Sequence, residues 1–249
     1  MHDLSPTTRF SDRAADYARF RPDYPAAAID KVLAGLGDPH DLTVADVGAG
    51  TGISARLIAD RGARVLAIEP NREMRQQAEP HDRIEWVSAT GEETGLAPES
   101  VGLVLSAQAF HWLRQPEALT EFHRILVPGG RLALVWNSRD RTDPFTRGFI
   151  EAIHAVQGEH PAELRPFDCN IVEAGGEFTA PWLSVFPNKQ SLDRDGLIRR
   201  AWSASYVPRD GAVGAELVRR FDALVEQFRD ERGLVALRYR CEVWISTRR

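Results

Sequence analysis

The segment Val44-Ala-Asp-Val-Gly-Ala-Gly-Thr-Gly52 carries the clearest structural signal in this 249-residue chain. It joins a short apolar run, typical of a buried strand, to an amphipathic pattern typical of a helix. Gly48, Gly50 and Gly52 allow the backbone to turn sharply and to approach a ligand that a Cβ atom would exclude. Asp46, near the end of the strand, can order this loop or accept hydrogen bonds from a ligand ammonium group. The segment therefore predicts a strand, a ligand-binding turn and a helix.

Short apolar runs alternate with helical patterns over roughly the first 140 residues. The predicted strands are Thr43–Val47, Arg64–Glu69, Ile84–Ser88, Val101–Ser106 and Arg131–Asn137. They are rich in Val, Ile and Leu, as expected of strands buried on both faces. Predicted helices follow Gly52 and span Pro116–Leu126. This alternation predicts an α/β fold with a parallel sheet and right-handed crossovers.

The pattern changes after Asn137. The later predicted elements are a helix over 144–157, an irregular region over 158–181, a strand over Trp182–Asn188, a helix from Val213 to Phe228 and a last strand over Leu234–Ile245. We expect one domain over residues 1–249, with a helical cap inserted at 138–181. Residues 182–249 would then complete the sheet.

An acidic side chain ends the second predicted strand. Glu69 lies about 20 residues beyond the glycine loop, where a carboxylate accepts both ribose hydroxyls of a nucleoside. A dinucleotide site has the spacing GxGxxG and places pyrophosphate at a helix N-terminus. The glycines here follow GxGxG, and Asp46 would repel pyrophosphate but suit an ammonium group. The combination favours S-adenosylmethionine over NAD.

Polar and aromatic side chains follow the other strands. In an open α/β sheet, ligands bind outside the carboxyl ends of the strands. Four segments would therefore meet at one edge of the sheet: Gly48–Gly52, Glu69, Thr90–Glu92 and Gln108–Trp112. This convergence predicts the cofactor site.

Several residues are candidates for the chemistry itself. The rings of Tyr17, Phe110 and Trp112 could stabilise a sulfonium, as aromatic faces do for other cations, although Phe110 and Trp112 could equally be core residues. His111 is the candidate general base, because its pKa lies near neutrality, but it could instead be a structural histidine. Trp136 could line the acceptor pocket or simply pack.

Arginine is abundant in this chain. Arg13, Arg19, Arg21 and Arg139 could hold an acidic acceptor, but the general arginine bias makes each one weak evidence.

Composition limits the classes of function. The formal net charge of −5 gives no electrostatic case for nucleic acid, and no apolar run approaches the length of a membrane span. The two cysteines, Cys169 and Cys241, form no disulfide framework or zinc motif. The amino terminus lacks the apolar segment of a secretory signal. We therefore expect a cytoplasmic protein without a metal site.

At these motifs the sequence resembles the class I S-adenosylmethionine-dependent methyltransferases, and most closely the small-molecule group that includes trans-aconitate methyltransferases. The matching segments are Phe10–Pro25 for the amino-terminal lid, Asp46–Gly52, Glu69-Pro70, Ala107–Trp112 and Leu126–Gly130. The resemblance implies a Rossmann-like, mostly parallel seven-stranded sheet with an antiparallel last strand and a helical cap after the fifth strand. It also implies a lid over residues 1–30.

The resemblance further implies roles for residues. Tyr17 and Arg21 would close over the methionine part of the cofactor, Glu69 would hold the ribose, and Thr90–Glu92 would border the adenine. The full predicted cofactor set is Tyr17, Arg21, Asp46, Gly48, Ala49, Gly50, Gly52, Glu69, Pro70, Thr90, Gly91, Glu92, Gln108 and Phe110. His111 is the predicted catalytic residue, and Trp112 and Trp136 are the predicted substrate residues.

The predicted function is in-line transfer of a methyl group from S-adenosylmethionine to a small molecule, leaving S-adenosylhomocysteine. We expect the acceptor atom to be oxygen, in a carboxylate or hydroxyl group, ahead of nitrogen or carbon. Two alternatives stay open: a non-methylating enzyme that uses the same cofactor, such as a cyclase or lyase, and a cofactor-binding regulatory protein. We expect no nucleic-acid or membrane partner, and either a monomer or a homodimer.

Overall fold

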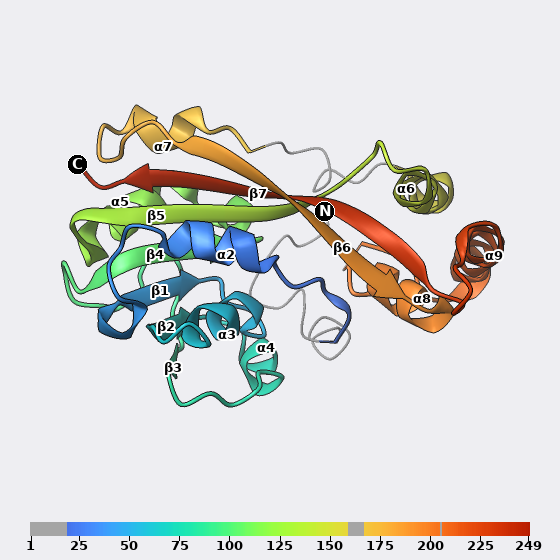
Figure 1. Ribbon diagram of the computed structural model, residues 1–249, viewed down its shortest axis with the longest axis horizontal. Helices are drawn as coiled ribbons and strands as arrows, with labels where there is room; N and C mark the ends of the chain where they lie inside the picture. The colour runs from blue at the N-terminus through green and yellow to red at the C-terminus, as the bar shows by residue number, and fades with distance from the viewer. Residues whose placement is uncertain (1–18, 159–166, 205) are drawn as a thin grey trace.

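The computed structural model describes residues 19–158, 167–204 and 206–249. Seven strands form one sheet in the order β3-β2-β1-β4-β5-β7-β6 (Figure 1). Their bounds are β1 Thr43–Val47, β2 Arg64–Ile68, β3 Ile84–Val87, β4 Val101–Ala107, β5 Leu126–Arg139, β6 Trp182–Leu192 and β7 Val235–Thr247. The first five strands are parallel, and β7 pairs antiparallel with both β5 and β6. The predicted Rossmann-like fold with an antiparallel last strand is confirmed.

Helices cover both faces of the parallel strands. Their bounds are α2 Ala26–Leu33, η2 Pro39–Asp41, α3 Ile53–Ala59, α4 Arg72–Gln76, η3 Phe110–Trp112, α5 Gln115–Ile125 and α7 Asn170–Ala174. Successive strand residues point to opposite faces. Val44 of β1 packs in the core shared with α2 and α3, whereas Ala45 packs in the core shared with α5 and α7. Burial on both faces explains the continuous apolar runs of these strands.

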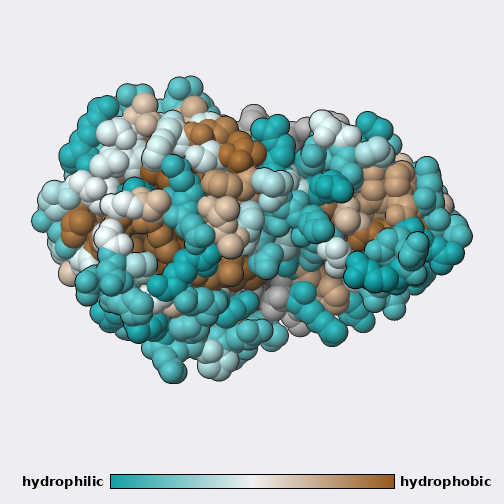
Figure 2. Space-filling model, in the orientation of Figure 1, coloured by the Kyte–Doolittle hydropathy of each residue, from teal (hydrophilic) through white to brown (hydrophobic). Residues whose placement is uncertain are grey.

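A separate helical lobe surrounds the C-terminal end of β6 and the N-terminal end of β7 (Figure 1). It contains α6 Pro144–Gln157, α8 Arg194–Trp202 and α9 Gly211–Phe228. Phe149 of α6 stacks on Phe221 of α9 with ring centroids 5.0 Å apart, and both side chains are fully buried. The lobe therefore has a hydrophobic core of its own. Figure 2 shows mostly hydrophilic side chains on one face, with hydrophobic patches on both the sheet and the helical lobe.

Several elements differ from the sequence predictions, which also did not include the helices α2, α4 and α7. β6 continues to Leu192 because it stays paired with β7 as far as Val235, and β5 begins at Leu126 because that residue pairs with Val101 across an irregular register. Helix α8 had not been predicted. The predicted lid, residues 1–30, and cap, 138–181, fall partly outside the described residues. Within the described ranges, no helix is long and apolar enough to cross a membrane.

Candidate active site

The glycine loop after β1 has the backbone that only glycine adopts easily. Gly48, Gly50 and Gly52 have φ values of 75°, 59° and 79°, in the left-handed region. A Cβ atom on Gly48 would overlap with the side chain of Ala109 at the end of β4. The loop and the segment after β4 are thus packed so closely that position 48 has no room for a side chain.

Glu69 is held rigidly at the end of β2. One carboxylate oxygen accepts a hydrogen bond from the Gly50 N–H at 2.9 Å, and the other accepts one from the Asn71 N–H at 2.8 Å. The side chain is 8% exposed, and its burial raises the pKa of the carboxyl, partly opposed by these two bonds and by Arg75. A carboxylate offers about four acceptor positions, so each oxygen keeps capacity for a ligand hydroxyl.

Asp46 is fully buried at the end of β1. Its Oδ2 accepts a hydrogen bond of 2.7 Å from the Ser54 hydroxyl in α3. Oδ1 has no hydrogen-bond partner within the described ranges, although the Ala55 N–H is near enough to favour the charged form. Burial raises the pKa of this carboxyl to about 7, and the charge of Glu69 adds to the rise. Asp46 therefore ties the strand to the helix behind the loop.

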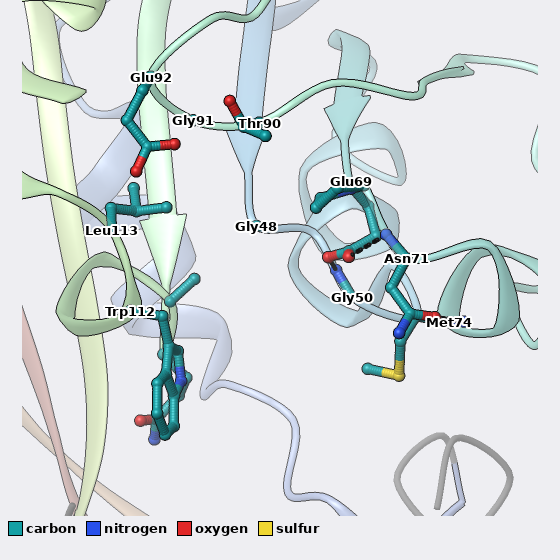
Figure 3. A pocket seen from close by; sticks show the side chains of 13 residues that line it. Gly48, Gly50, Glu69, Asn71, Met74, Thr90, Gly91, Glu92, Trp112 and Leu113 are labelled. Atoms are coloured by element: carbon teal, nitrogen blue, oxygen red, sulfur yellow. Dashed lines mark hydrogen bonds between the residues drawn. The ribbon is translucent and has the colours of Figure 1, made fainter. Parts of the chain in front are cut away.

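A pocket opens where the carboxyl ends of β1, β2 and β4 meet (Figure 3). Residues predicted for the site that line it are Gly48, Gly50, Glu69, Pro70, Thr90, Gly91, Glu92, Gln108 and Trp112. In Figure 3, Glu69 and Met74 lie on one side of Gly48, and Glu92 and Trp112 lie on the other. The four strand-end segments predicted to converge do so around this pocket.

Other predicted site residues lie elsewhere. Asp46, Ala49, Gly52 and Phe110 are buried and do not line the pocket. Phe110 packs against Phe122 and Phe167. This packing agrees with the alternative, left open by the sequence, that Phe110 is a core residue. Tyr17 lies outside the described residues. The cofactor roles of these residues stay predictions.

Three lining residues were missed, Asn71, Met74 and Leu113, and Ala109 was included only as part of the segment Gln108–Trp112. Asn71 accepts a hydrogen bond of 2.9 Å from the Met74 N–H and so caps α4. An asparagine three positions before the residue it bonds is a recognisable capping signal. Met74 and Leu113 carry no such signal, since an apolar residue looks the same in a core and in a pocket wall.

Gln108 has a strained backbone at the end of β4. Its φ is 58°, which is rare for a residue other than glycine. The backbone N–H donates to the carbonyl of Val135 at 2.8 Å, and Nε2 donates to the carbonyl of Asn137 at 3.2 Å. These bonds to β5 hold the strained turn, and such strain is typical of ligand-binding sites.

His111 and Trp136 form a pair beside the pocket. The Trp136 indole N–H donates to His111 Nδ1 at 3.3 Å, and the Trp136 ring stacks on Phe167 at 4.6 Å. Because indole is only a donor, Nδ1 must carry a lone pair, so a neutral His111 has its proton on Nε2. The arrangement makes His111 a hydrogen-bond donor through Nε2.

Arg21 is the remaining residue predicted to contact the cofactor. Its side chain donates to the Ser203 carbonyl at 3.3 Å.

The groups around the pocket suit a nucleoside that carries a positively charged sulfonium tail. The carboxylate oxygens of Glu69 are acceptors of the kind that hydroxyl groups need, and Met74 and Trp112 supply apolar and aromatic surface. No group of three or more metal-binding side chains occurs in the part of the chain that the structure describes.

Comparison with known proteins gives the same assignment. A sequence profile described as a methyltransferase domain matches residues 45–134, which contain the whole pocket. An uncharacterized methyltransferase of Schizosaccharomyces pombe is 30% identical over 208 residues, 80% of each chain. An uncharacterized methyltransferase of Mycobacterium tuberculosis is 40% identical over 147 residues, 58% of each chain, and a methyltransferase-like protein of Schizosaccharomyces pombe is 32% identical over 160 residues, 61% of its length. The chain thus spans about three fifths of the length of the last two relatives.

Among solved structures, a candidate type II methyltransferase from Anaeromyxobacter dehalogenans has the same fold. Its TM-score is 0.62 at 24% identity, and the match covers 92% of this chain and 98% of that chain. The trans-aconitate subgroup has no support in these comparisons and stays a prediction. This chain matches four fifths of a related methyltransferase and has the shared fold and the pocket described above. It therefore belongs to the family of class I S-adenosylmethionine-dependent methyltransferases.

Proposed function

We propose that this protein transfers a methyl group from S-adenosylmethionine in line to an oxygen atom, of a carboxylate or hydroxyl group, on a small molecule. The observation that carries the proposal is the pocket at the strand ends, with Glu69 fixed at one side and Trp112 at the other. S-adenosylmethionine, when bound, supplies an electrophilic methyl group on a positively charged sulfur.

The chain's own residues would bind and orient. Glu69 presents its remaining acceptor positions to hydroxyl groups, and the glycine loop leaves room for close approach of the ligand. Met74 and Leu113 line the pocket with apolar surface. Because proximity alone lowers the barrier of a displacement substantially, positioning can supply most of the catalysis.

The acidic side chains at the pocket already accept hydrogen bonds from the backbone, which supports a methyl acceptor that needs no strong base. Both oxygens of Glu69 accept backbone N–H groups, and Glu92 accepts the Arg114 N–H at 2.8 Å. His111 already accepts a hydrogen bond at Nδ1. A carboxylate acceptor is nucleophilic at neutral pH without deprotonation, whereas a hydroxyl acceptor would have to pass its proton to a base or to solvent.

The test is a screen for S-adenosylhomocysteine release from S-adenosylmethionine with small carboxylic acids, phenols and alcohols as acceptors. Release that requires an acceptor, with the methyl group found on its oxygen by mass spectrometry, supports the proposal. Methylated nitrogen or carbon, or a cyclised product, overturns it.

With an acceptor in hand, we expect His111→Ala to keep cofactor affinity and to slow turnover. His111 lies beside the pocket but does not line it, so the cofactor contacts stay intact. Calorimetry and steady-state rates measure the two effects separately. A loss of cofactor affinity at normal turnover would make His111 a binding residue instead.

A further inference from the structure

An irregular loop forms part of the wall of the cofactor pocket. It comprises residues 88–100, all of which the structure describes, and it joins β3 to β4 without a helix or strand of its own. Thr90, Gly91 and Glu92 of this loop line the pocket (Figure 3). Such a loop has no regular ladder of backbone hydrogen bonds to hold it, so its attachments to the rest of the fold decide the shape of the pocket.

The loop packs closely where it lines the pocket. A Cβ atom on Gly91 would lie 2.8 Å from Leu113 Cδ1 and 2.9 Å from Val47 Cγ1. Next to it, a carboxylate oxygen of Glu92 accepts the backbone N–H of Arg114 at 2.8 Å. The lining residues therefore keep their positions only while the loop stays packed against β1 and the segment before α5.

Glu121 anchors the loop just beyond these lining residues. It belongs to α5 and is 8% exposed. Its Oε1 accepts hydrogen bonds from the backbone N–H of Thr94 at 3.0 Å and from the Thr94 hydroxyl at 2.5 Å. Thr94 is fully buried and follows Glu92 by two residues. The Thr94 hydroxyl oxygen also accepts the backbone N–H of Leu96 at 3.3 Å, so a single carboxylate organises this part of the loop.

Arg124 completes this arrangement from the next turn of α5. Its Nε donates to Oε2 of Glu121 at 2.7 Å, and its Nη2 donates to Oε1 at 2.8 Å and to the carbonyl of Leu96 at 2.7 Å. Burial raises the pKa of Glu121, but the hydrogen bonds from Arg124 and Thr94 outweigh it and lower the pKa below its ordinary value. Glu121 thus accepts four hydrogen bonds, about the capacity of a carboxylate, and its role is to hold protein groups and not a ligand.

We propose that the loop anchor, defined as Thr94, Glu121 and Arg124, positions the pocket wall Thr90–Glu92 and thereby raises the affinity for the cofactor. Glu121 does not line the pocket, so it is a positioning residue that acts through Thr94. Gly91 and Thr94 are three positions apart, a reach of at most about 11 Å, so release of Thr94 also frees the wall. This inference rests on the proposed function, because the wall belongs to the same cofactor site.

The helical lobe contains a matching arrangement outside the pocket. Asp143, at the N-terminus of α6, accepts both the backbone N–H and the hydroxyl of Thr146 at 2.8 Å. The Thr146 hydroxyl accepts the backbone N–H of Arg238 at 2.9 Å, just as the Thr94 hydroxyl accepts that of Leu96. Both threonines are fully buried. Variants in the lobe therefore control for the loss of a buried carboxylate–threonine bond as such.

The experiment measures the affinity for S-adenosylhomocysteine by calorimetry, at a temperature where urea unfolding shows each variant to be folded. We expect Thr94→Val and Glu121→Gln to weaken binding by about fivefold or more, because a hydrogen bond to a buried charge is weakened or lost and the packed loop is less populated. The lobe variants Thr146→Val and Asp143→Asn should bind as the wild type does. Thr94→Ser, which keeps the hydroxyl, should restore the wild-type affinity.

Hydrogen exchange of the ligand-free protein tests the anchor without the cofactor. Thr94→Val and Glu121→Gln should speed amide exchange over residues 88–96, and Thr146→Val should leave that segment unchanged. If the wild type binds no S-adenosylhomocysteine, the proposed function fails, while the exchange rates still decide whether the anchor holds the loop. Wild-type affinity or unchanged loop exchange in both loop variants would overturn the inference. Equal affinity losses in the loop and lobe variants would overturn it as well, since they would report on stability alone.

Discussion

Glu69 connects the sequence motif to the geometry of the pocket. Its position about 20 residues after the glycine loop predicted a ribose-binding acid. The two backbone N–H groups that hold its carboxylate come from Gly50 and Asn71, so the loop and the β2 end are joined through this side chain. The spacing in the sequence predicts the ribose-binding role of Glu69, but it does not predict that this side chain also joins the glycine loop to the end of β2.

We expect Glu69→Ala to weaken binding of S-adenosylmethionine at least tenfold. The change removes the acceptor of the ribose hydroxyls and also leaves two backbone donors without their bonds. Isothermal titration calorimetry measures the loss, with Glu85→Ala on the exposed side of β3 as a control for general effects. Unchanged affinity would remove Glu69 from the site.

Asp46 gives a prediction about stability and pH. Its pKa is about 7 in the folded protein and 3.8 when unperturbed, so between these values the folded state holds a proton that the unfolded state lacks. The contribution of Asp46 to stability is therefore greatest below about pH 4 and falls as the pH rises toward 7, by at most about 1.4 kcal/mol per pH unit.

The variant Asp46→Asn removes this titration. We expect its free energy of unfolding to fall less between pH 5 and pH 7 than that of the wild type, because asparagine keeps an acceptor for Ser54 without a proton to lose. Urea unfolding at several pH values measures both slopes. Identical slopes would mean that Asp46 is ionised throughout the range.

At the scale of elements, the strands were predictable and part of the helical lobe was not. β1, β2 and β4 are buried on both faces, so their apolar runs are unmistakable. Helix α8 is different, because Gly196 interrupts it and Arg200 replaces an apolar residue on its buried side. A charge at a buried position hides the helical periodicity on which the prediction depends.

The residues that line the pocket show the same limit of prediction from sequence. Gly48, Glu69 and Gln108 follow strands and could be found from their spacing, whereas Met74 and Leu113 come from segments whose approach to the site depends on tertiary packing.

The close contact between the glycine loop and the β4 end gives a prediction for Gly48→Ala. We expect loss of most S-adenosylhomocysteine affinity, because the new methyl group would push Ala109 and the pocket wall away. Gly233→Ala is the matched control: its φ is 76°, similar to the 75° of Gly48, but no atom lies within 4 Å of the added Cβ. Equal affinity losses in both variants, measured by calorimetry, would show that backbone strain and not the contact matters.

At the scale of the whole molecule, the sheet and the helical lobe have separate cores joined by the long strands β6 and β7 (Figure 1). The pocket lies at the strand ends of the sheet.

We expect Phe221→Ala to lower the free energy of unfolding by about 3–5 kcal/mol, because it leaves a cavity against Phe149 in the lobe core. The folded variant should still bind S-adenosylhomocysteine as the wild type does. Urea unfolding and calorimetry give the two values, with Val213→Ala, an exposed site on α9, as the control. A strong loss of cofactor affinity at temperatures where the variant is folded would show that the lobe contributes to the pocket.

The central claim is that the pocket at the strand ends binds an adenosyl-sulfonium cofactor and not a dinucleotide. The most direct measurement is calorimetric titration of the purified protein with S-adenosylmethionine, S-adenosylhomocysteine and NAD. The account predicts binding of the first two at roughly micromolar concentration and no binding of NAD, because the GxGxG spacing of the loop differs from the GxGxxG spacing that places pyrophosphate at a helix N-terminus. Clear binding of NAD, or of none of the three, would contradict it.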